Sequence, residues 1–341
     1  MKVNAKEFKS AVEYVTKYSH AKYDLIFRDG AITGLNEDNV GQKLYLSYKI
    51  EGAEAGPVIN GRELAKLRKL FKFWKTELEI TQEDNKVIIT DGIHSFSCET
   101  KFNDWVPDVG ETIEEESFNA SSFAEKGKKL VPFASTDCYR EGLHGVYFDA
   151  EDGSLVATDG KRLGYISYPK KLPSMHLPSG IFAKIAGMGS CLFRLSQKGE
   201  DKFLTVTDGM KTVTAYLIGA NFPNWRRVVP PTDGSFVQAV DIASLKEAAE
   251  YAVQSTDHTH KALMTDGKFC GVGYKAEPPL EAALYFNAIY IKEALDQLNG
   301  DFKFYVQKST SFEGLETFET TKAVTLTDGE LNAIIMPMCA E

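Results

Sequence analysis

The sequence predicts an α+β protein of three similar domains, each with two helices packed on antiparallel sheets. The tripeptide Thr-Asp-Gly recurs along the chain, and the copies that begin at Thr90, Thr207 and Thr327 are about 120 residues apart. Asp-Gly is a turn signal, because Gly accepts a positive φ and Asp bonds its own backbone. An alternating apolar run follows each of these copies, so each predicts a hairpin. Further copies begin at Thr158 and Thr265.

A second repeated segment has the same spacing. Residues 102–107 read Phe-Asn-Asp-Trp-Val-Pro, and residues 222–228 read Phe-Pro-Asn-Trp-Arg-Arg-Val. A period this long indicates repeated domains and not a solenoid. We therefore expect domains at 1–116, 117–234 and 235–341, with linkers in the acidic segment 109–117 and the Pro-rich segment 230–236.

Each domain is expected to open with a helix and to present a second helix about 60 residues later. Asn4, Asn119 and, more faintly, Asp241 have the character of N-caps. The expected helices lie near 4–19, 61–74, 119–134, 178–188, 241–256 and 287–299. Between them, alternating apolar and aromatic runs at 44–50, 146–148 and 302–306 predict strands.

Composition is that of a globular protein, with 26% charged residues and no run apolar and long enough to span a bilayer. No apolar run follows the N-terminal residues, so we expect no signal peptide. The five cysteines are scattered without a Cys-x-x-Cys pair, which favours reduced thiols in a cytoplasm over disulfides or zinc. We expect a cytoplasmic protein that needs no cofactor or metal and has no membrane partner.

Basic side chains gather on predicted helices although the net charge is −9. Three of the six helices carry a basic face opposite an apolar stripe, whereas acidic residues concentrate in segments such as 111–116 and 313–319. An ordinary solvated helix face is the alternative for any single helix. Together, the basic faces favour a shared cationic surface for DNA phosphates. The candidate DNA-binding residues are Lys9, Lys17, Arg62, Lys66, Lys69, Lys72, Lys126, Lys129 and Lys184.

Recognisable catalytic motifs are missing from the sequence. No segment forms a Gly-x-x-x-x-Gly-Lys phosphate loop, and residues 187–189 lack the spacing of a dinucleotide fingerprint. His258 and His260 could share a strand face, but a metal site needs a further ligand. The aspartates of the Thr-Asp-Gly copies are better explained as turn residues than as catalytic carboxylates. No catalytic residue is therefore predicted, and we expect a protein that is not an enzyme.

Three segments together resemble the bacterial DNA polymerase III beta subunit, the sliding clamp family. They are residues 157–163 (Ala-Thr-Asp-Gly-Lys-Arg-Leu), residues 222–228 and residues 334–338 (Ile-Ile-Met-Pro-Met). The resemblance implies a DNA-clamp fold and a head-to-tail homodimer, whose six domains form a ring with helices lining the hole. The chain departs from the family at Lys161, where His is usual, and at its end, 339–341. These departures bear on peptide preference and not on the ring.

The resemblance also implies a pocket for short peptides between the second and third domains. Its expected residues are Leu143, Thr158, Gly160, Lys161, Arg162, Leu163, Pro223, Arg227, Val228, Asn287, Tyr290, Ile335, Met336, Pro337 and Met338. Met and branched aliphatic residues accept Leu and Phe side chains, while Arg and Asn orient a peptide backbone.

The implied function is that of a processivity clamp that encircles duplex DNA without reading its sequence. Its implied partners are the DNA polymerase III alpha subunit, a clamp loader complex, other proteins with a clamp-binding motif and a second copy of itself. Two alternatives remain at this point. One is a peptide-binding scaffold of repair or replication proteins that never encircles DNA, and the other is a hydrolase that uses Asp159 or the two histidines.

Overall fold

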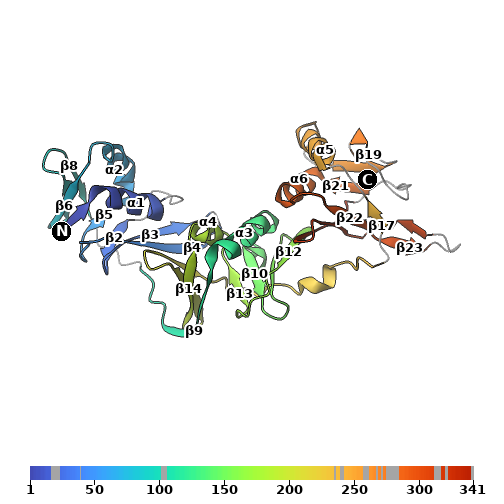
Figure 1. Ribbon diagram of the computed structural model, residues 1–341, viewed down its shortest axis with the longest axis horizontal. Coiled ribbons are helices and arrows are strands. Elements are labelled where there is room, and N and C mark those ends of the chain that lie inside the picture. The colour runs from blue at the N-terminus through green and yellow to red at the C-terminus, as the bar shows by residue number, and fades with distance from the viewer. Residues whose placement is uncertain are drawn as a thin grey trace. The chain divides into compact units, whose positions relative to one another are not determined.

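The computed structural model describes most of the chain. The described residues are 1–16, 24–38, 40–100, 106–233, 236–238, 242–255, 261–265, 268–269, 272–273, 284–310, 316–318 and 322–338. They form two compact units, each built around an eight-stranded antiparallel sheet (Figure 1). Unit 1 comprises Met1–Glu125 with Gly180–Gly219, and unit 2 comprises Lys126–Ser179 with Ala220–Glu341.

Unit 1 contains two sheets. The smaller has the order β1-β6-β7-β8 and the larger the order β5-β2-β3-β4-β16-β15-β14-β9. The strands of the smaller sheet are β1 (Lys2–Asn4), β6 (Glu77–Glu83), β7 (Lys86–Thr90) and β8 (Ser95–Glu99). Those of the larger are β2 (Leu25–Arg28), β3 (Ala31–Glu37), β4 (Lys43–Lys49), β5 (Val58–Ile59), β9 (Glu111–Asn119), β14 (Ser190–Lys198), β15 (Asp201–Thr207) and β16 (Lys211–Tyr216).

Unit 2 contains the second large sheet, in the order β13-β10-β11-β12-β26-β25-β22-β17, together with the sheet β20-β19-β18-β21 and the hairpin β23-β24. The strands of the large sheet are β10 (Val146–Asp149), β11 (Ser154–Thr158), β12 (Arg162–Ser167), β13 (Met175–Leu177), β17 (Phe236–Gln238), β22 (Lys303–Val306), β25 (Val324–Thr327) and β26 (Leu331–Ile335). The remaining strands are β18 (Lys261–Thr265), β19 (Lys268–Phe269), β20 (Val272–Gly273), β21 (Leu284–Asn287), β23 (Lys308–Thr310) and β24 (Glu316–Phe318).

Six α-helices occur in the described residues, at the six places where the sequence predicts them. They are α1 (Ala5–Thr16), α2 (Leu64–Leu70), α3 (Ala120–Leu130), α4 (Gly180–Ile185), α5 (Ile242–Ser255) and α6 (Ala288–Gln297). The expected N-caps form at Asn4, whose Oδ1 accepts from the Lys6 amide at 2.9 Å, and at Asn119, whose Oδ1 accepts from the Ser122 amide at 3.2 Å. Asp241 lies outside the described residues.

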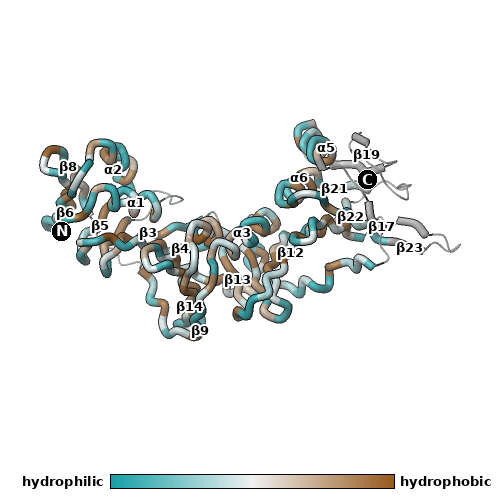
Figure 2. Tube along the Cα trace, in the orientation of Figure 1, coloured by the Kyte–Doolittle hydropathy of each residue, from teal (hydrophilic) through white to brown (hydrophobic). Residues whose placement is uncertain are grey.

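A buried aromatic residue near the start of α1 and of α3 joins each of these two helices to its sheet. Phe8 of α1 stacks on Phe27 at 6.4 Å and meets Phe71 edge-on at 6.1 Å. Phe123 of α3 meets Phe193 of β14 edge-on at 5.7 Å and also contacts the ring of Phe182 in α4 at 5.7 Å. None of the described helices combines the length and apolar character needed to cross a membrane, and Figure 2 shows hydrophilic and hydrophobic stretches alternating along the tube.

The order of strands repeats three times along the chain. One half-sheet is β5-β2-β3-β4 in the first repeat, β13-β10-β11-β12 in the second and β21-β18-β19-β20 in the third. The other half-sheet is β1-β6-β7-β8, then β9-β14-β15-β16, then β17-β22-β25-β26. The α+β fold with two helices per repeat, expected from the spacing of Thr-Asp-Gly, is confirmed.

Two seams join the repeats into continuous sheets. At the first, β4 pairs with β16, and Leu46 lies opposite Val213. At the second, β12 pairs with β26, and Leu163 lies opposite Ile334. Among the described residues, β8 pairs only with β7 and β20 only with β19. Strand β8 of the first repeat therefore has no partner on its outer edge within the described chain, and neither does β20 of the third. These two strands hold the positions in their repeats that pair at the two internal seams.

The prediction that residues 109–117 form a linker is wrong. Residues Glu111–Asn119 form β9, which pairs along its length with β14. Arg194 compensates one of the acidic side chains, with its Nη2 2.7 Å from an Oε of Glu115. This strand spans the boundary expected at residue 116, and the proposed limits of the three domains stay a prediction.

Candidate functional site

The Thr-Asp-Gly turn between β11 and β12 is held by its own side chains. The Thr158 hydroxyl donates to the Arg162 carbonyl at 2.6 Å, and the Gly160 amide donates to the same hydroxyl at 3.1 Å. Asp159 Oδ1 accepts from the amides of Lys161 and Arg162 at 2.9 and 3.0 Å. Gly160 has a φ of 87°, a conformation that other residues rarely adopt.

The same hydrogen bonds recur in the other described copies of the tripeptide. The second residue accepts two backbone amides in each: Asp91 from Ile93 and His94, Asp208 from Met210 and Lys211, and Asp328 from Glu330 and Leu331. These aspartates are turn residues, as the sequence predicts, and this bonding argues against a catalytic role for Asp159. The copy at Thr265 is only partly within the described residues.

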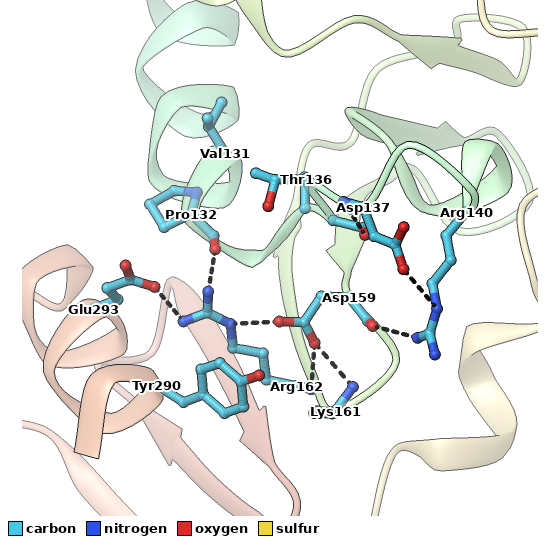
Figure 3. A pocket seen from close by; sticks show the side chains of 12 residues that line it. Val131, Pro132, Thr136, Asp137, Arg140, Asp159, Lys161, Arg162, Tyr290 and Glu293 are labelled. Atoms are coloured by element: carbon cyan, nitrogen blue, oxygen red, sulfur yellow. Dashed lines mark hydrogen bonds and ion pairs between the residues drawn. The ribbon is translucent and has the colours of Figure 1, made fainter. Parts of the chain in front are cut away.

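Arg162 is the centre of the candidate site. Its buried guanidinium contacts Asp159 Oδ2 at 3.1 Å, the Pro132 carbonyl at 2.6 Å and Glu293 Oε2 at 2.5 Å (Figure 3). It also lies over the ring of Tyr290, with the guanidinium carbon 4.3 Å from the ring centroid. Because its partners come from the β11–β12 turn, from the segment after α3 and from α6, this one side chain ties three elements of unit 2 together.

A cleft of about 580 Å³ opens beside Arg162. It is lined by Val131, Pro132, Ala134, Ser135, Thr136, Asp137, Arg140, Asp159, Lys161, Arg162, Tyr290 and Glu293. Three of these, Lys161, Arg162 and Tyr290, are among the predicted peptide-binding residues. Burial raises the pKa of Tyr290, and the Asp159 carboxylate acts in the same direction, so its phenol stays neutral and can donate a hydrogen bond.

Among the other predicted peptide-binding residues, Leu163 and Ile335 lie on the β12–β26 seam, and Met336 and Met338 follow directly after β26. The Met336 amide donates to the Lys161 carbonyl at 3.1 Å, and the Met338 amide donates to the Tyr285 carbonyl at 2.7 Å. Asn287 caps α6 by accepting from the Ile289 amide at 2.9 Å. Backbone hydrogen bonds thus hold Met336 and Met338 against β12 and β21.

Leu163 is not on the surface. Its side chain is 2% exposed and packs in a cluster with Val156, Trp225, Ala323 and Ile334. Ile335, on the same seam, is fully buried. These two predicted contact residues support the floor of the site from below, which corrects the expectation that they touch a peptide.

Two apolar side chains above that floor are accessible. Val228 is 54% exposed and Met336 is 44% exposed. Pro223 and Arg227 are exposed in the same segment as Val228, and Leu143 and Pro337 are half-buried. The exposed set can meet a partner's apolar side chains.

The segment that carries Val228 is fixed by a buried polar contact. It forms a 3-10 turn, Trp225–Val228, and the Trp225 indole N–H donates to Asp149 Oδ2 at 2.9 Å. Arg226 Nη1 lies 2.9 Å from the same oxygen. Burial alone would raise the pKa of Asp149, but the bonds from Trp225 and Arg226 outweigh it and lower that pKa.

The cleft residues between 131 and 140, and Glu293, are not among the site residues predicted from the sequence. Asp137 and Arg140 form an ion pair at 3.6 Å, and Arg140 also donates to the Asp159 carbonyl at 3.1 Å. Their only signal was proximity to the end of a predicted helix, and contact with the β11–β12 turn depends on the tertiary fold.

The predicted DNA-binding residues fall into four groups. Arg62, Lys69 and Lys72 are exposed in or beside α2. Lys9 and Lys66 are exposed but lie 3.9 and 2.8 Å from Glu13 and Glu63. Lys126 and Lys129 lie 2.6 and 2.5 Å from Glu330. Lys184 is only 7% exposed, so we no longer count it as a DNA contact. Lys17 lies outside the described residues.

The part of the chain that the structure describes contains no group of His, Cys, Asp and Glu able to hold a metal ion. His258 and His260, the pair considered from the sequence, lie outside that part. The candidate site in unit 2 thus consists of the β11–β12 turn, the cleft beside Arg162 and the exposed apolar side chains of Val228 and Met336.

Comparison with known proteins agrees with this architecture. No protein-family model matches the chain. It is 25% identical over 209 residues to the Beta sliding clamp of Pseudomonas aeruginosa, a match that covers 57% of this chain and 53% of that protein. The match thus spans about half the length of this curated relative.

Solved structures of sliding clamps superimpose on almost the whole chain. A Pseudomonas aeruginosa DNA polymerase sliding clamp with ligand has a TM-score of 0.77 at 17% identity and covers 100% of this chain, with 99% of that chain matched. The DNA polymerase III beta subunit of Thermotoga maritima gives 0.74 at 16%, with coverages of 100% and 99%. A Helicobacter pylori beta clamp bound to a DNA ligase peptide gives 0.70 at 18%, with coverages of 99% and 100%. The resemblance seen in the sequence is confirmed, and the chain has this fold.

Proposed function

We propose that this chain, which has the sliding-clamp fold, is a non-catalytic processivity factor that encircles duplex DNA as a head-to-tail homodimer in the cytoplasm. A closed ring holds its partner on DNA by topology, so it needs neither a catalytic group nor base readout. The proposal is carried by one observation, the threefold repeat of the strand order, in which the edges at β8 and β20 have no partner strand among the described residues.

The open edges support a second copy as partner. Within the chain, the β4 edge of one repeat is joined to β16 of the next, and β12 is joined to β26. By the same rule β20 of one copy would pair with β8 of another. A two-fold ring would then leave neither edge exposed, which satisfies both closure and the need to protect edge strands.

The DNA surface of the proposed ring is made by its helices. Arg62, Lys69 and Lys72 on and beside α2 can face phosphates without losing a described ion pair. Lys126 and Lys129 share one carboxylate, so they supply less free charge. A weakly attractive surface suits a protein that must slide, because it holds the phosphates without a fixed register.

Partners would dock on unit 2. The exposed Val228 and Met336 would accept the apolar side chains of a short peptide, while Arg162 and Tyr290 hold the adjoining wall. The beta clamp of Helicobacter pylori binds a DNA ligase peptide, which supports peptide docking in this fold. We propose the DNA polymerase III alpha subunit, the clamp loader complex and other proteins with a clamp-binding motif as partners.

Retention on DNA tests the ring. The protein should stay bound to nicked circular DNA after a loader places it there, and should be lost when the circle is cut. Lys69→Glu with Lys72→Glu should shorten retention, and the matched pair Lys86→Glu with Lys202→Glu, exposed on strands, should not. Equal retention on linear and circular DNA would refute encirclement.

Peptide binding tests the docking surface. A labelled Gln-Leu-Ser-Leu-Phe peptide should bind, and Val228→Asp or Met336→Asp should abolish the anisotropy change. Ile113→Asp, an exposed apolar position on β9, is the control. A scaffold that never encircles DNA would bind this peptide but would show no difference between circular and linear DNA.

A further inference from the structure

At the first internal seam, the Thr-Asp-Gly turn of one repeat meets the first helix of the preceding repeat. Lys211 Nζ lies 5.7 Å from the ring centroid of Tyr14 in α1, and the Met210 carbonyl accepts from the Lys49 amide at 2.9 Å. Burial, followed by the nearby Asp208 carboxylate, raises the pKa of Tyr14. The turn and the helix are therefore in contact.

At the second seam the corresponding elements meet again with different chemistry. Glu330 follows Gly329 in its turn, and its two carboxylate oxygens lie 2.6 and 2.5 Å from Lys126 and Lys129 of α3. Hydrogen bonds from Lys126 and then Lys129 lower the pKa of Glu330. The same turn and the same helix meet at both seams, although the turn residue in contact is the second after Gly209 at the first seam and the first after Gly329 at the second.

The helix position is the same in each case. Tyr14 and Lys129 each lie six residues after the first large buried residue of their helix, Phe8 or Phe123. In α5 the corresponding buried residue is Leu245, and six residues later stands Tyr251, whose side chain is 65% exposed. Helix α5 therefore presents an aromatic side chain at the seam position, and no seam forms there among the described residues.

The Thr-Asp-Gly turn of the first repeat also exposes an apolar side chain, and no first helix of a preceding repeat covers it. Ile93 follows Gly92 in the turn before β8, as Met210 and Glu330 follow their glycines, and Ile93 is 84% exposed. His94, the next residue, stacks on the exposed Phe73 ring at 5.3 Å. This turn thus carries a small apolar surface beside the open edge of β8.

We infer that Tyr251 of one copy packs against Ile93 and the His94–Phe73 pair of a second copy, so that these residues close the ring. The inference rests on the proposed homodimer and assigns its contact residues. The partner is a second copy of this chain. The turn at Ile93 and the helix at Tyr251 correspond to the turn and the helix that contact each other at both internal seams. An apolar closing contact also differs from the ionic contact at the second seam.

Sedimentation velocity on the full chain tests the assignment. Ile93→Glu or Tyr251→Glu should raise the dimer Kd about 100-fold, since a loss of about tenfold per contact counts at both contacts of the ring. Met210→Glu is the matched control, because it changes the corresponding residue of an internal seam and should leave the Kd unchanged. The double variant Ile93→Lys with Tyr251→Glu should recover a dimer, which a folding defect could not do.

A cysteine pair gives a second readout. Ile93→Cys with Tyr251→Cys should form a disulfide-linked dimer on oxidation, above the background of either single variant. A stable dimer in both glutamate variants, with retention on circular DNA intact, would overturn the residue assignment and leave the clamp function standing. A wild-type chain that stays monomeric and is lost equally from circular and linear DNA would overturn both.

Discussion

Replacing Arg162 with Met should loosen one side of the candidate site. The substitution keeps most of the side-chain volume but removes the contacts to Asp159, to the Pro132 carbonyl and to Glu293. Asp159 retains its two backbone amides, and Glu293 is partly exposed, so water can compensate both carboxylates in part. The Pro132 carbonyl loses the guanidinium as a donor.

The cost follows from these losses. One charge-assisted hydrogen bond contributes about 1.5–3 kcal/mol, and the partly buried Pro132 carbonyl left without this donor adds at most about 1–3 kcal/mol. Partial hydration favours the lower part of that sum, about 3 kcal/mol, or roughly a 100-fold change in an opening equilibrium. The loss should be local, because β11, β12 and the segment after α3 meet at this side chain.

Hydrogen exchange followed by mass spectrometry measures this opening directly. Amides of β11 and β12 should exchange about 100-fold faster in Arg162→Met, while those of β2 and β3 in unit 1 should not change. Arg227→Met, an exposed arginine of the same unit, serves as the control. Unchanged exchange in β12 would refute the view that Arg162 holds the turn to the rest of unit 2.

Two further predictions concern individual residues. Lys126 and Lys129 lower the pKa of Glu330 in the folded chain. Glu330 therefore stabilises the fold at pH values above its unfolded pKa, and this stabilisation is lost as pH falls through its folded pKa. Glu330→Gln should accordingly flatten the acid limb of a profile of melting temperature against pH. A wild-type-like acid limb would contradict this. Gly160→Ala should lower the free energy of unfolding by about 1–2 kcal/mol, because the φ of Gly160 is 87°. Gly187→Ala is the control and should be neutral, because an added Cβ there meets nothing within 4 Å. Equal melting temperatures of the two variants would refute the prediction for Gly160.

Local chemistry explains what could be predicted from the sequence. The turns at Asp91, Asp159 and Asp208 are stabilised by side chains within the turn itself, so the tripeptide is enough to identify them. The six helices follow from apolar periodicity and from caps such as Asn4 and Asn119. The spacing of these local signals then predicts the repeat and the fold class.

Tertiary pairing explains what could not be predicted. The acidic segment that forms β9 looks like a linker until its partner Arg194 is placed beside Glu115. Leu163 and Lys184 are equally plausible as surface residues, and only packing buries them. Glu293 joins the cleft because α6 lies against the segment after α3, a contact that no local pattern encodes.

Because of the seams at β4–β16 and β12–β26, the boundaries of the repeats do not coincide with those of the two compact units. The middle repeat contributes one half-sheet to unit 1 and the other to unit 2. Excising it would cut through two hydrogen-bonded ladders and bare two long strand edges, each a template for aggregation. Because the segments of the two units alternate along the chain, no continuous fragment contains one eight-stranded sheet without part of the other.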